Sequence, residues 1–540
     1  MKHVGQRLAS TACSRHICGI GYVGPHLSTR TLATAPEPRE CPFHQQNNGD
    51  EYDNKIKTSN SQQESDTDKN DVSKVLTDIP GPRGLPVFGS ALEFLVPTRH
   101  RILERRSKEY GPIFRERVGP MQSVNLCDPT DVEHALRNEG KHPHRLEVPP
   151  WKEYRQMKGL PFGLVISNGP EWQKARSAVN KPMMKQKVIL KYLDDMNEVV
   201  DDAVRRFKLY RNGEKVMPDL DQEFFHWSIE SVGTVMFETR LGCLEDQRPQ
   251  IATDFVQSVR KILAPNKLLF VNPGLARKLG LRCWKEHEAA WDKIYEIGKV
   301  VIEKRMIEMD EERKRGKEVE GVLVSLLENA DTNDPVMVNT LVTDLFLGAV
   351  DTSPNTMQFA LLLLAKNRDK QEKLRREINN IVKPGSIVKA KDLQSLPFLK
   401  AIFKEALRMY PIVPTFGKIY TQEMTIRDYK IPADTMVNVV CCAMGRDPKL
   451  FKDPEIFRPE RWLKDGEEKE DIHPFSSIPF GYGKRSCIGR RIAELQMYLL
   501  LARLTQSFDI HPTDGDKPIE AKVKLLMCPK TTPLLRFDDI

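Results

Sequence analysis

The chain has 540 residues, far more than one small domain needs to bury a core, and length alone allows several domains. Lysine and arginine outnumber aspartate and glutamate by 83 to 75, a mild excess that favours acidic partners or anionic lipid. No dense basic stripe with interleaved aromatic residues occurs, which argues against nucleic-acid binding. The ten cysteines form no CxxC pair and no zinc-like spacing, so a reducing compartment fits best.

Residues 1–36 contain no aspartate or glutamate but carry a lysine, several arginines and several hydroxyl side chains. This composition is typical of a mitochondrial transit peptide, with a disordered basic tail as the alternative. No apolar h-region of a secretory signal and no membrane-spanning run occur near this end. Residues 37–78 are polar and mixed in charge, so we expect a disordered linker. A proline-rich stretch over 79–89 then predicts a stiff, non-helical lead-in.

Trp172 and Arg176 stand four residues apart, so they lie on one face of the helix expected around them. An indole N–H and a guanidinium together suit a carboxylate such as a propionate. A stacked pair on the surface is the common alternative, and the spacing alone leaves both open.

An apolar cluster at 268–271 lies within the segment 255–284 and is flanked by lysines and arginines. Apolar side chains rimmed by cations suit the surface of an anionic membrane. A helix–loop–helix packed on the core explains the same pattern, and the sequence leaves both readings open.

The segment 341–365 is apolar almost all round, but Asp344, Asp351 and Thr352 interrupt it. Unpaired charges are costly in lipid, so we expect a helix through the protein core instead of a membrane span. Pro354 cannot donate to the carbonyl of Val350, which predicts a break in the helix beside an acid and an alcohol. Such a notch can hold water and relay protons.

The run 399–408 predicts a helix that Pro411 stops. Glu405 and Arg408 lie three residues apart and can pair on one face, although isolated pairs of this kind are usually weak surface bridges. Arg461 follows some fifty residues later.

The most informative stretch is Phe480–Gly489, in which three glycines loosen a loop around Cys487 and its neighbour Arg485. A helical spacing of apolar residues follows at once. A thiolate just ahead of a helix lies near backbone N–H groups, which favours its ionised form. Arg485 is placed to neutralise a carboxylate. A buried structural cysteine is the alternative for most loops of this composition.

The complete spacing Phe-Gly-x-Gly-x-Arg-x-Cys-x-Gly resembles the haem-ligand loop of the cytochrome P-450 family, the haem-thiolate monooxygenases. The resemblance covers the chain from about Asp78 to the C-terminus. It implies a single catalytic domain over 79–540 with a cytochrome P-450 fold, mainly α with a smaller β portion. It also implies haem b as cofactor and insertion of one oxygen atom of O2 into a lipophilic substrate.

The resemblance further assigns cofactor contacts. It implies that Cys487 is the axial ligand of the haem iron, with Phe480 and Arg485 in the same loop, and that Trp172 and Arg176 hold the propionates. Where the family commonly places an arginine on a propionate after Pro411, this chain offers Lys418, a point charge without the bidentate fork.

Three other parts of the resemblance concern catalysis, support and the substrate. The stretch 348–353 resembles the oxygen-activation motif, in which Asp351 and Thr352 assist protonation of bound oxygen, and Ala349 stands where glycine is more usual. Glu405, Arg408 and Arg461 match a Glu–Arg–Arg triad that supports the fold near the haem loop. The loop 148–162, with Trp151, Tyr154 and Phe162, is similar to the segment that roofs the substrate. Residues 413–416, 526 and 527 would line the pocket.

The chain resembles the mitochondrial branch of the family, in which cations dock an acidic [2Fe-2S] ferredoxin. The residues that carry this resemblance are Lys400, Lys404, Arg490 and Arg491. The resemblance then implies that an NADPH-dependent flavin reductase supplies the electrons, and that the enzyme lies on the matrix side of the inner mitochondrial membrane, in peripheral contact with it. Sterols or steroids are the first substrate hypothesis. The alternatives are lipophilic foreign compounds, a microsomal-type enzyme served by a diflavin reductase, and a haem-binding sensor or carrier without turnover.

Overall fold

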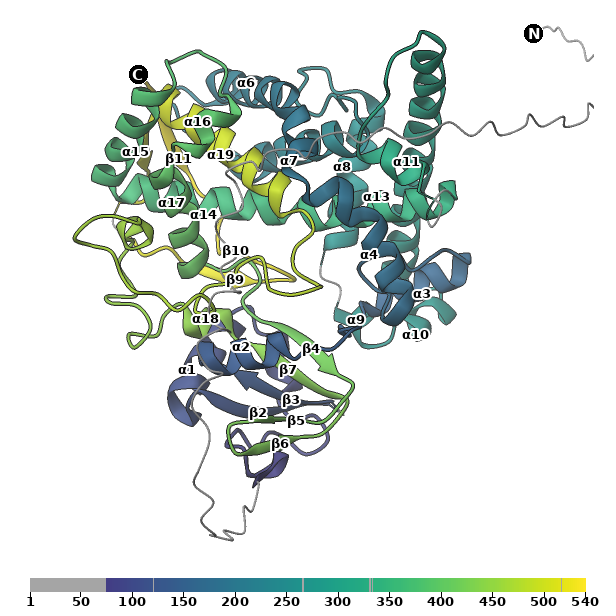
Figure 1. Cartoon of the computed structure of the whole chain (residues 1–540), viewed down its shortest axis with the longest axis vertical. Coiled ribbons are helices and arrows are strands. Elements are labelled where there is room, and N and C mark those ends of the chain that lie inside the picture. The colour runs from purple at the N-terminus through teal and green to yellow at the C-terminus, as the bar shows by residue number, and fades with distance from the viewer. Residues whose placement is uncertain (1–73, 120, 265–266, 330–331, 333, 516) are drawn as a thin grey trace, which may run out of the picture. The chain divides into compact units, whose positions relative to one another are not determined.

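The computed structural model describes residues 74–540 apart from 120, 265–266, 330–331, 333 and 516 (Figure 1). The predicted transit peptide, residues 1–36, and most of the predicted linker lie outside the described residues. One compact unit spans Val72–Ile540. Of the folded part, the structure shows mainly helices with a smaller share of strands, as the sequence predicts.

The folded unit begins before the predicted boundary between residues 78 and 79. Strand β1 (Lys74–Val75) pairs in parallel with β6 (Tyr429–Ile431), and the turn η1 (Leu76–Asp78) follows it. The Asp78 carboxylate accepts a hydrogen bond from the Val75 amide (2.9 Å), which closes that turn. The end of the predicted linker is therefore ordered, because a strand edge and a local cap give its backbone partners that composition does not reveal.

Helices form most of the unit and surround one long hydrophobic core. The α-helices are α1 (Arg99–Tyr110), α2 (Pro129–Arg137), α3 (Pro149–Lys158), α4 (Gly169–Met184), α5 (Gln186–Ile189), α6 (Leu193–Tyr210), α7 (Leu220–Met236), α8 (Gln250–Leu263), α9 (Lys267–Val271), α10 (Pro273–Lys278), α11 (Arg282–Lys314), α12 (Val322–Leu327), α13 (Pro335–Ala349), α14 (Thr352–Lys366), α15 (Arg368–Ile381), α16 (Ala390–Gln394), α17 (Pro397–Met409), α18 (Cys441–Met444) and α19 (Arg490–Ser507). The remaining 3-10 turns are η2 (Ala91–Leu95), η3 (Leu190–Tyr192) and η4 (Pro459–Trp462).

The largest sheet has the strand order β2–β3–β7–β4 and carries a second, smaller hydrophobic core (Figure 1). Its strands are β2 (Ile113–Val118), β3 (Met121–Leu126), β7 (Thr435–Val439) and β4 (Phe416–Tyr420). β3 pairs with β2 antiparallel and with β7 in parallel, and β4 pairs with β7 antiparallel. β4 brings Phe416 and Gly417 to the border of the cavity described below.

Three smaller sheets complete the described fold. The order β1–β6–β5 includes β5 (Met424–Ile426), β9 (Ala521–Val523) pairs with β10 (Met527–Pro529), and β8 (Phe508–Pro512) pairs with β11 (Leu535–Asp539). The antiparallel β8–β11 pair directly follows α19, so the end of the chain returns to the helical core.

The long apolar segment forms two helices, α13 and α14, with a break at Val350 and Asp351. The Asp334 carboxylate caps α13 by accepting from the Val336 amide (3.1 Å). Almost all of α14 is buried, as expected for a helix through the core. The break lies four residues before Pro354, whose missing N–H leaves the Val350 carbonyl without its helical donor. The prediction of a core helix with a notch is confirmed.

Candidate active site

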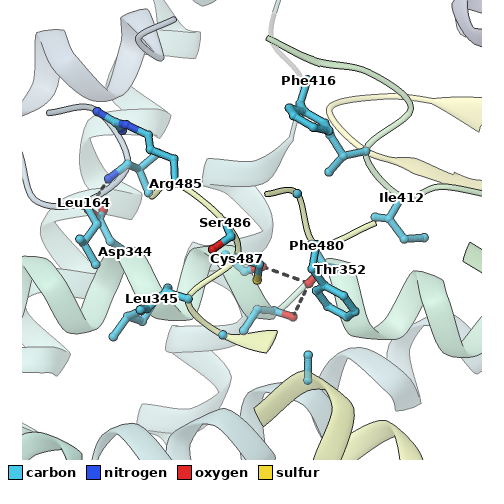
Figure 2. Close-up of a pocket in the computed structure, with 18 of the residues that line it drawn as sticks. Leu164, Asp344, Leu345, Thr352, Ile412, Phe416, Phe480, Arg485, Ser486 and Cys487 are labelled. Carbon is cyan, nitrogen blue, oxygen red and sulfur yellow. Dashed lines mark hydrogen bonds between the residues drawn. The ribbon is translucent and has the colours of Figure 1, made fainter. Parts of the chain in front are cut away.

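A cavity of about 540 Å³ lies between the break of the α13–α14 helix and the loop Phe480–Gly489. Figure 2 shows Cys487 and Thr352 near the centre of this cavity, with Leu164 and Asp344 on one side of the view and Ile412 and Phe416 on the other. Its wall is mostly apolar. The residues that carry this apolar character include Leu146, Leu164, Val165, Val232, Leu345, Ile412, Val413, Phe416, Met436 and Phe480.

The loop Phe480–Gly489 is held by backbone bonds inside itself. The Cys487 amide donates to the Phe480 carbonyl (2.8 Å), and the Ser486 amide donates to the Gly483 carbonyl (3.0 Å). Gly483 has φ +79°, and a Cβ there would lie 2.3 Å from Glu139 Oε1. Glycine is therefore needed at this turn for its backbone conformation and for the close approach of Glu139.

The Cys487 side chain opens onto the cavity. Burial raises the pKa of its thiol, whereas the Gly489 amide and nearby arginines lower it, and the net direction is upward. The helix N-terminus at Gly489 and Arg490 therefore does not by itself produce the ionised thiol that the sequence predicted. A thiolate here needs a metal partner, which deprotonates a coordinating thiol.

Three guanidinium groups converge beside Cys487 without an anion. Arg176 donates to the Ser486 carbonyl (2.9 Å), and Arg145 donates to the Arg485 carbonyl (2.5 Å). Arg485 lies over the Trp172 ring (4.0 Å to the centroid) and donates to backbone carbonyls of the 143–168 segment. No carboxylate among the described residues forms an ion pair with Arg145, Arg176 or Arg485.

This cluster has the properties of a site for a dianion. Burial is the main cause that lowers the pKa of Arg176 to about 10 and that of Arg485 to about 9, and neighbouring arginines lower both further. Arg485 Nη1 is buried and has no hydrogen-bond partner among the described residues. Buried, mutually repelling cations with an unused donor fit the two propionates of haem b, and Trp172, Arg176 and Arg485 all line the cavity.

Arg145 is a cavity residue that sequence reasoning missed. It lines the cavity beside Cys487, and burial lowers the pKa of its guanidinium. Arg145 lies outside any helix or strand, so no periodic pattern marks it. Its place depends on Arg485, 340 residues later in the chain.

Lys418 does not face the cavity as the family pattern suggested. Its neighbours Phe416 and Gly417 line the wall, but its ammonium pairs with the Glu139 carboxylate and donates to the Tyr482 carbonyl (3.3 Å). Glu139 also accepts from the Lys484 amide (2.6 Å). Both members of the pair are buried, so Glu139 neutralises the lysine charge locally. Through these contacts Lys418 supports the loop Phe480–Gly489 and does not offer its charge to the cavity.

Asp351 lies in the helix break, and Thr352 is the first residue of α14. Thr352 lines the cavity, and its hydroxyl donates to the Gly348 carbonyl (3.1 Å) and approaches the Ala349 carbonyl (3.4 Å; Figure 2). Burial and the charge of Asp221 raise the pKa of Asp351. Thr352 is thus part of the cavity wall, whereas Asp351 is not among the residues that line the cavity.

The structure brings Glu405, Arg408 and Arg461 together in a fully buried group. Arg408 donates to both Glu405 oxygens (2.9 and 2.7 Å), and Arg461 Nε donates to Oε1 (3.1 Å). The Trp462 indole N–H also donates to Oε2 (2.8 Å), and the Arg458 amide donates to Oε1 (3.0 Å). The carboxylate is completely paired, so this group fixes α17 to η4 without reaching the cavity.

The loop 148–162 departs from its expected role. Trp151 and Tyr154 are buried against Trp291 of α11, at 5.5 and 5.4 Å between ring centroids, because α3 packs its aromatic side outward from the cavity. The cavity wall is formed by Leu164 and Val165, just beyond the predicted segment.

The four predicted docking cations gather at the exposed start of α19 and on α17. Arg490 pairs with Glu494 (2.8 Å), and Arg491 lies 3.9 Å from the same carboxylate. Burial is the main cause that lowers the pKa of Lys404, and the charge of Arg490 adds to it. Lys400 also interacts with the charge of Glu494, so all four cations share one face.

Comparison with known proteins agrees with this geometry. A family model described as Cytochrome P450 matches residues 79–536. The mitochondrial sterol 26-hydroxylase of Rattus norvegicus is 35% identical over 474 residues, which cover 86% of this chain and 88% of that protein. The mitochondrial 1,25-dihydroxyvitamin D(3) 24-hydroxylase of the same species is 34% identical over 450 residues, covering 82% and 86%. The mitochondrial 25-hydroxyvitamin D-1 alpha hydroxylase of Rattus norvegicus is 33% identical over 480 residues, which cover 87% of this chain and 95% of that protein.

Proposed function

Because the chain belongs to the cytochrome P450 family and to its mitochondrial branch, it is a haem b monooxygenase, and we propose that it hydroxylates a sterol-like lipophile in the mitochondrion. The observation that carries the proposal is the apolar cavity above Cys487, whose wall offers few polar groups to a substrate. Relatives of similar length bear names of sterol and vitamin D hydroxylases, which supports a substrate of that shape and polarity.

In the reaction, R–H, O2, NADPH and a proton give R–OH, water and NADP⁺. One oxygen atom enters the new C–O bond, and the other leaves as water with two protons and the two electrons of NADPH. Bound haem supplies the activation of O2, and a thiolate ligand favours cleavage of the O–O bond. We assign that ligand to Cys487, whose side chain opens onto the cavity.

The arginine cluster is assigned to the haem propionates. Trp172 and Arg176 come from one face of α4, and Arg485 stacks on the Trp172 ring from the haem loop. Arg145 adds a fourth donor group from the preceding segment. Two propionates would neutralise the repulsion between these cations and use the free Arg485 Nη1. Phe480 lies in the same wall and closes the cavity beside Cys487.

Thr352 and Asp351 are assigned to proton supply. The Thr352 hydroxyl faces the cavity, and the break of the α13–α14 helix leaves carbonyl groups there that can hold a water. The raised pKa of Asp351 brings its carboxyl closer to the pH at which it can both accept and give a proton. The negative charge of Asp221, whose side chain is 44% exposed, contributes to this rise in pKa.

A [2Fe-2S] ferredoxin is the proposed electron donor, itself reduced by an NADPH-dependent flavin reductase. The cations of Lys400, Lys404, Arg490 and Arg491 share one face near the haem loop, and of the carboxylates that the structure describes only Glu494 lies within ion-pair distance of the two arginines. An acidic partner would meet complementary charge there, and the association would depend on salt.

Peripheral contact with the matrix side of the inner membrane is proposed for α9 and α10. The segment 255–284 contains both buried and exposed apolar residues, so core packing and membrane contact each find support. Phe255 and Leu269 are buried in the core, whereas Val271 is 79% and Leu279 is 63% exposed. Exposed apolar side chains with cations nearby suit an anionic lipid surface. Among the described residues, no helix combines the length and apolar character of a membrane span.

The membrane proposal is tested with vesicles containing an anionic lipid. We expect Val271→Asp together with Leu279→Asp to reduce vesicle binding. Val300→Asp is the matched control, because Val300 is an exposed apolar residue on α11 (51%) outside the α9–α10 segment. Equal binding by the double variant and the control would contradict this contact surface.

The substrate is tested by spectral titration of the purified haem protein with sterols, secosteroids and unrelated lipophiles, followed by turnover with reductase and ferredoxin. A saturable spin-state shift with a sterol and a ferredoxin-dependent hydroxylated product would support the proposal. A shift only with foreign lipophiles would favour the detoxification alternative. Turnover with a diflavin reductase but not with ferredoxin would favour the microsomal-type enzyme. A thiolate-ligated protein that never consumes O2 with NADPH would favour the sensor or carrier.

A further inference from the structure

Asp344 is a fully buried carboxylate in the wall of the cavity, two helical turns before Thr352 on the same long segment. It accepts hydrogen bonds from two consecutive backbone amides, that of Leu164 (2.7 Å; Figure 2) and that of Val165 (3.1 Å). Both of these residues line the cavity. The carboxylate therefore holds a stretch of wall by its main chain and leaves the apolar side chains free to meet a substrate.

Arg155 supplies the opposite charge. Its Nη2 donates to Asp344 Oδ1 (2.5 Å), its Nη1 donates to the Phe162 carbonyl, and the side-chain exposures of the pair are 0% and 1%. A buried pair of this kind contributes little to net stability, because desolvation offsets the attraction, but it does fix geometry. Here the pair ties the segment 162–165 to α13 at both its carbonyl and its amide groups.

Gly163 makes this close approach possible. Its φ is +68°, and a Cβ at this position would lie 2.4 Å from Asp344 Oδ2 and 2.9 Å from Thr340 Cγ2. Only glycine lets the main chain pass directly over the carboxylate in this conformation.

The helix that carries Arg155 is itself anchored away from the cavity. Arg155 lies over the Trp291 ring (5.3 Å), and Tyr154 stacks on the same ring with an angle of 17°. The Tyr154 hydroxyl donates to Asp292 (2.8 Å), so α3 is fixed to α11. The arginine is thus presented to Asp344 from a rigid support.

We propose that Asp344 is a positioning residue that, with Arg155, holds Leu164 and Val165 as a rigid wall and so decides which part of a substrate reaches the haem. The term "Asp344 clamp" is used below for Asp344, Arg155 and the amides of Leu164 and Val165. The inference rests on the monooxygenase reaction and not on the sterol proposal, because a wall of fixed shape selects among lipophiles of any class.

The test uses azoles that bind haem iron whatever the natural substrate is. Imidazole is small enough to reach the iron without touching the wall, whereas 1-tritylimidazole must contact it. The variant Asp344→Asn removes the charge that holds the amides and keeps the volume. Gly163→Ala keeps both charges but places a Cβ 2.4 Å from Asp344 Oδ2 and 3.1 Å from Arg155 Nη1, so the main chain of the wall must move away from the clamp. Glu153→Gln is the matched control, because Glu153 lies on α3 like Arg155 but pairs with Arg277 of α10, outside the clamp.

We expect Asp344→Asn to accelerate hydrogen exchange of the Leu164 and Val165 amides by about 10-fold to 100-fold, since their acceptor loses its charge and the Asn NH2 group repels Arg155. Affinity for 1-tritylimidazole should fall by about 10-fold, because a mobile wall loses its preorganisation, while affinity for imidazole stays unchanged. Gly163→Ala should shift the same affinity ratio, and Glu153→Gln should shift neither readout.

Faster exchange with an unchanged affinity ratio would overturn the proposal, because the clamp would then be structural only. Equal losses for both azoles would also overturn it, since the haem site itself would have changed. If Asp344→Asn fails to bind haem, Gly163→Ala decides: a shifted ratio supports the clamp, and an unshifted ratio contradicts it.

Discussion

The two sides of the cavity are built in different ways. The proximal side, the loop Phe480–Gly489, closes its own turns by hydrogen bonds within the loop, such as that from the Cys487 amide to the Phe480 carbonyl, and distant residues such as Glu139 and Arg145 then add to it. The distal side, formed by Leu164, Val165 and Asp344, depends on a pair whose members lie 189 residues apart. The local side appears in the sequence as a motif, whereas the distal side appears only in the fold. The loop that carries Cys487 can therefore be recognised from the sequence, whereas the wall that we propose selects the substrate cannot.

The largest expected effect comes from breaking the buried group of Glu405, Arg408 and Arg461, which supports the proximal side of the cavity. Glu405→Gln should destabilise the fold by about 3–5 kcal/mol, because Arg408 and Arg461 would keep buried charges without a full counter-charge. Urea unfolding followed by circular dichroism measures this loss, and haem content should fall with it.

The matched control for that change is Glu286→Gln, which breaks an exposed pair with Arg282 on α11. Exposed pairs of this spacing are worth about 0.3–0.5 kcal/mol. Equal stability of the two variants would show that the buried triad does not support the haem loop.

Low pH should destabilise the packing of α3 on α11, which holds Arg155 on the distal side of the cavity. Burial lowers the pKa of His287 to about 4. The His287 ring accepts a hydrogen bond from the Trp291 indole (3.0 Å), and Tyr154 and Arg155 pack on that indole. The unfolded chain takes up this proton near pH 6.5, so stability is fully present above that pH and is lost as the pH falls toward 4. The loss should reach about 3 kcal/mol.

His287→Gln tests this pH dependence, because the amide oxygen can still accept from Trp291 but does not titrate. The difference in urea midpoint between the wild type and this variant should narrow as the pH falls from 6.5 to 4. A difference that stays constant with pH would show that His287 does not contribute. Buried His100 and His226 titrate in both proteins, so they cancel in the comparison.

The break between α13 and α14 lies beside the cavity, and Thr352 is one of the residues there that line the cavity wall. Thr352→Ala should lower product formation by about 10²-fold at an unchanged haem content, since a group that relays protons contributes on that scale. NADPH would still be consumed, and hydrogen peroxide would be released. Unchanged product per NADPH would remove Thr352 from proton supply.

The smallest expected effect concerns the outer face of the proximal side. Arg490→Gln with Arg491→Gln should slow ferredoxin association by about 10-fold at low salt, because steering by complementary charge is reduced. Haem binding should not change, and the difference should shrink as salt rises. An association rate and salt dependence equal to those of the wild type would place the docking face elsewhere.

Sequence patterns predicted the features that depend on nearby residues. Pro354 marks the helix break, the spacing of Glu405 and Arg408 marks the triad helix, and the glycines around Cys487 mark the loop. Patterns failed where a partner comes from a distant segment. The charge of Lys418 is taken up by Glu139, 279 residues away, and no spacing connects the two.

The same reason explains the roof of the cavity. The aromatic residues of 148–162 suggest contact with a substrate, but Trp151 and Tyr154 meet Trp291 of α11 instead. Burial among distant elements also reverses the expected pKa direction at Cys487, which a helix N-terminus alone would lower. Tertiary packing, and not local chemistry, decides these positions.

The claim on which the account depends is that Cys487 is the ligand of the haem iron, and the absorbance of the reduced carbon monoxide complex tests it most directly. In Cys487→His, we predict that Trp172, Arg176 and Arg485 still hold haem, while the absorbance band of the thiolate complex disappears. A carbon monoxide spectrum identical to that of the wild type would contradict the assignment and, with it, the orientation of the haem between the proximal and distal sides.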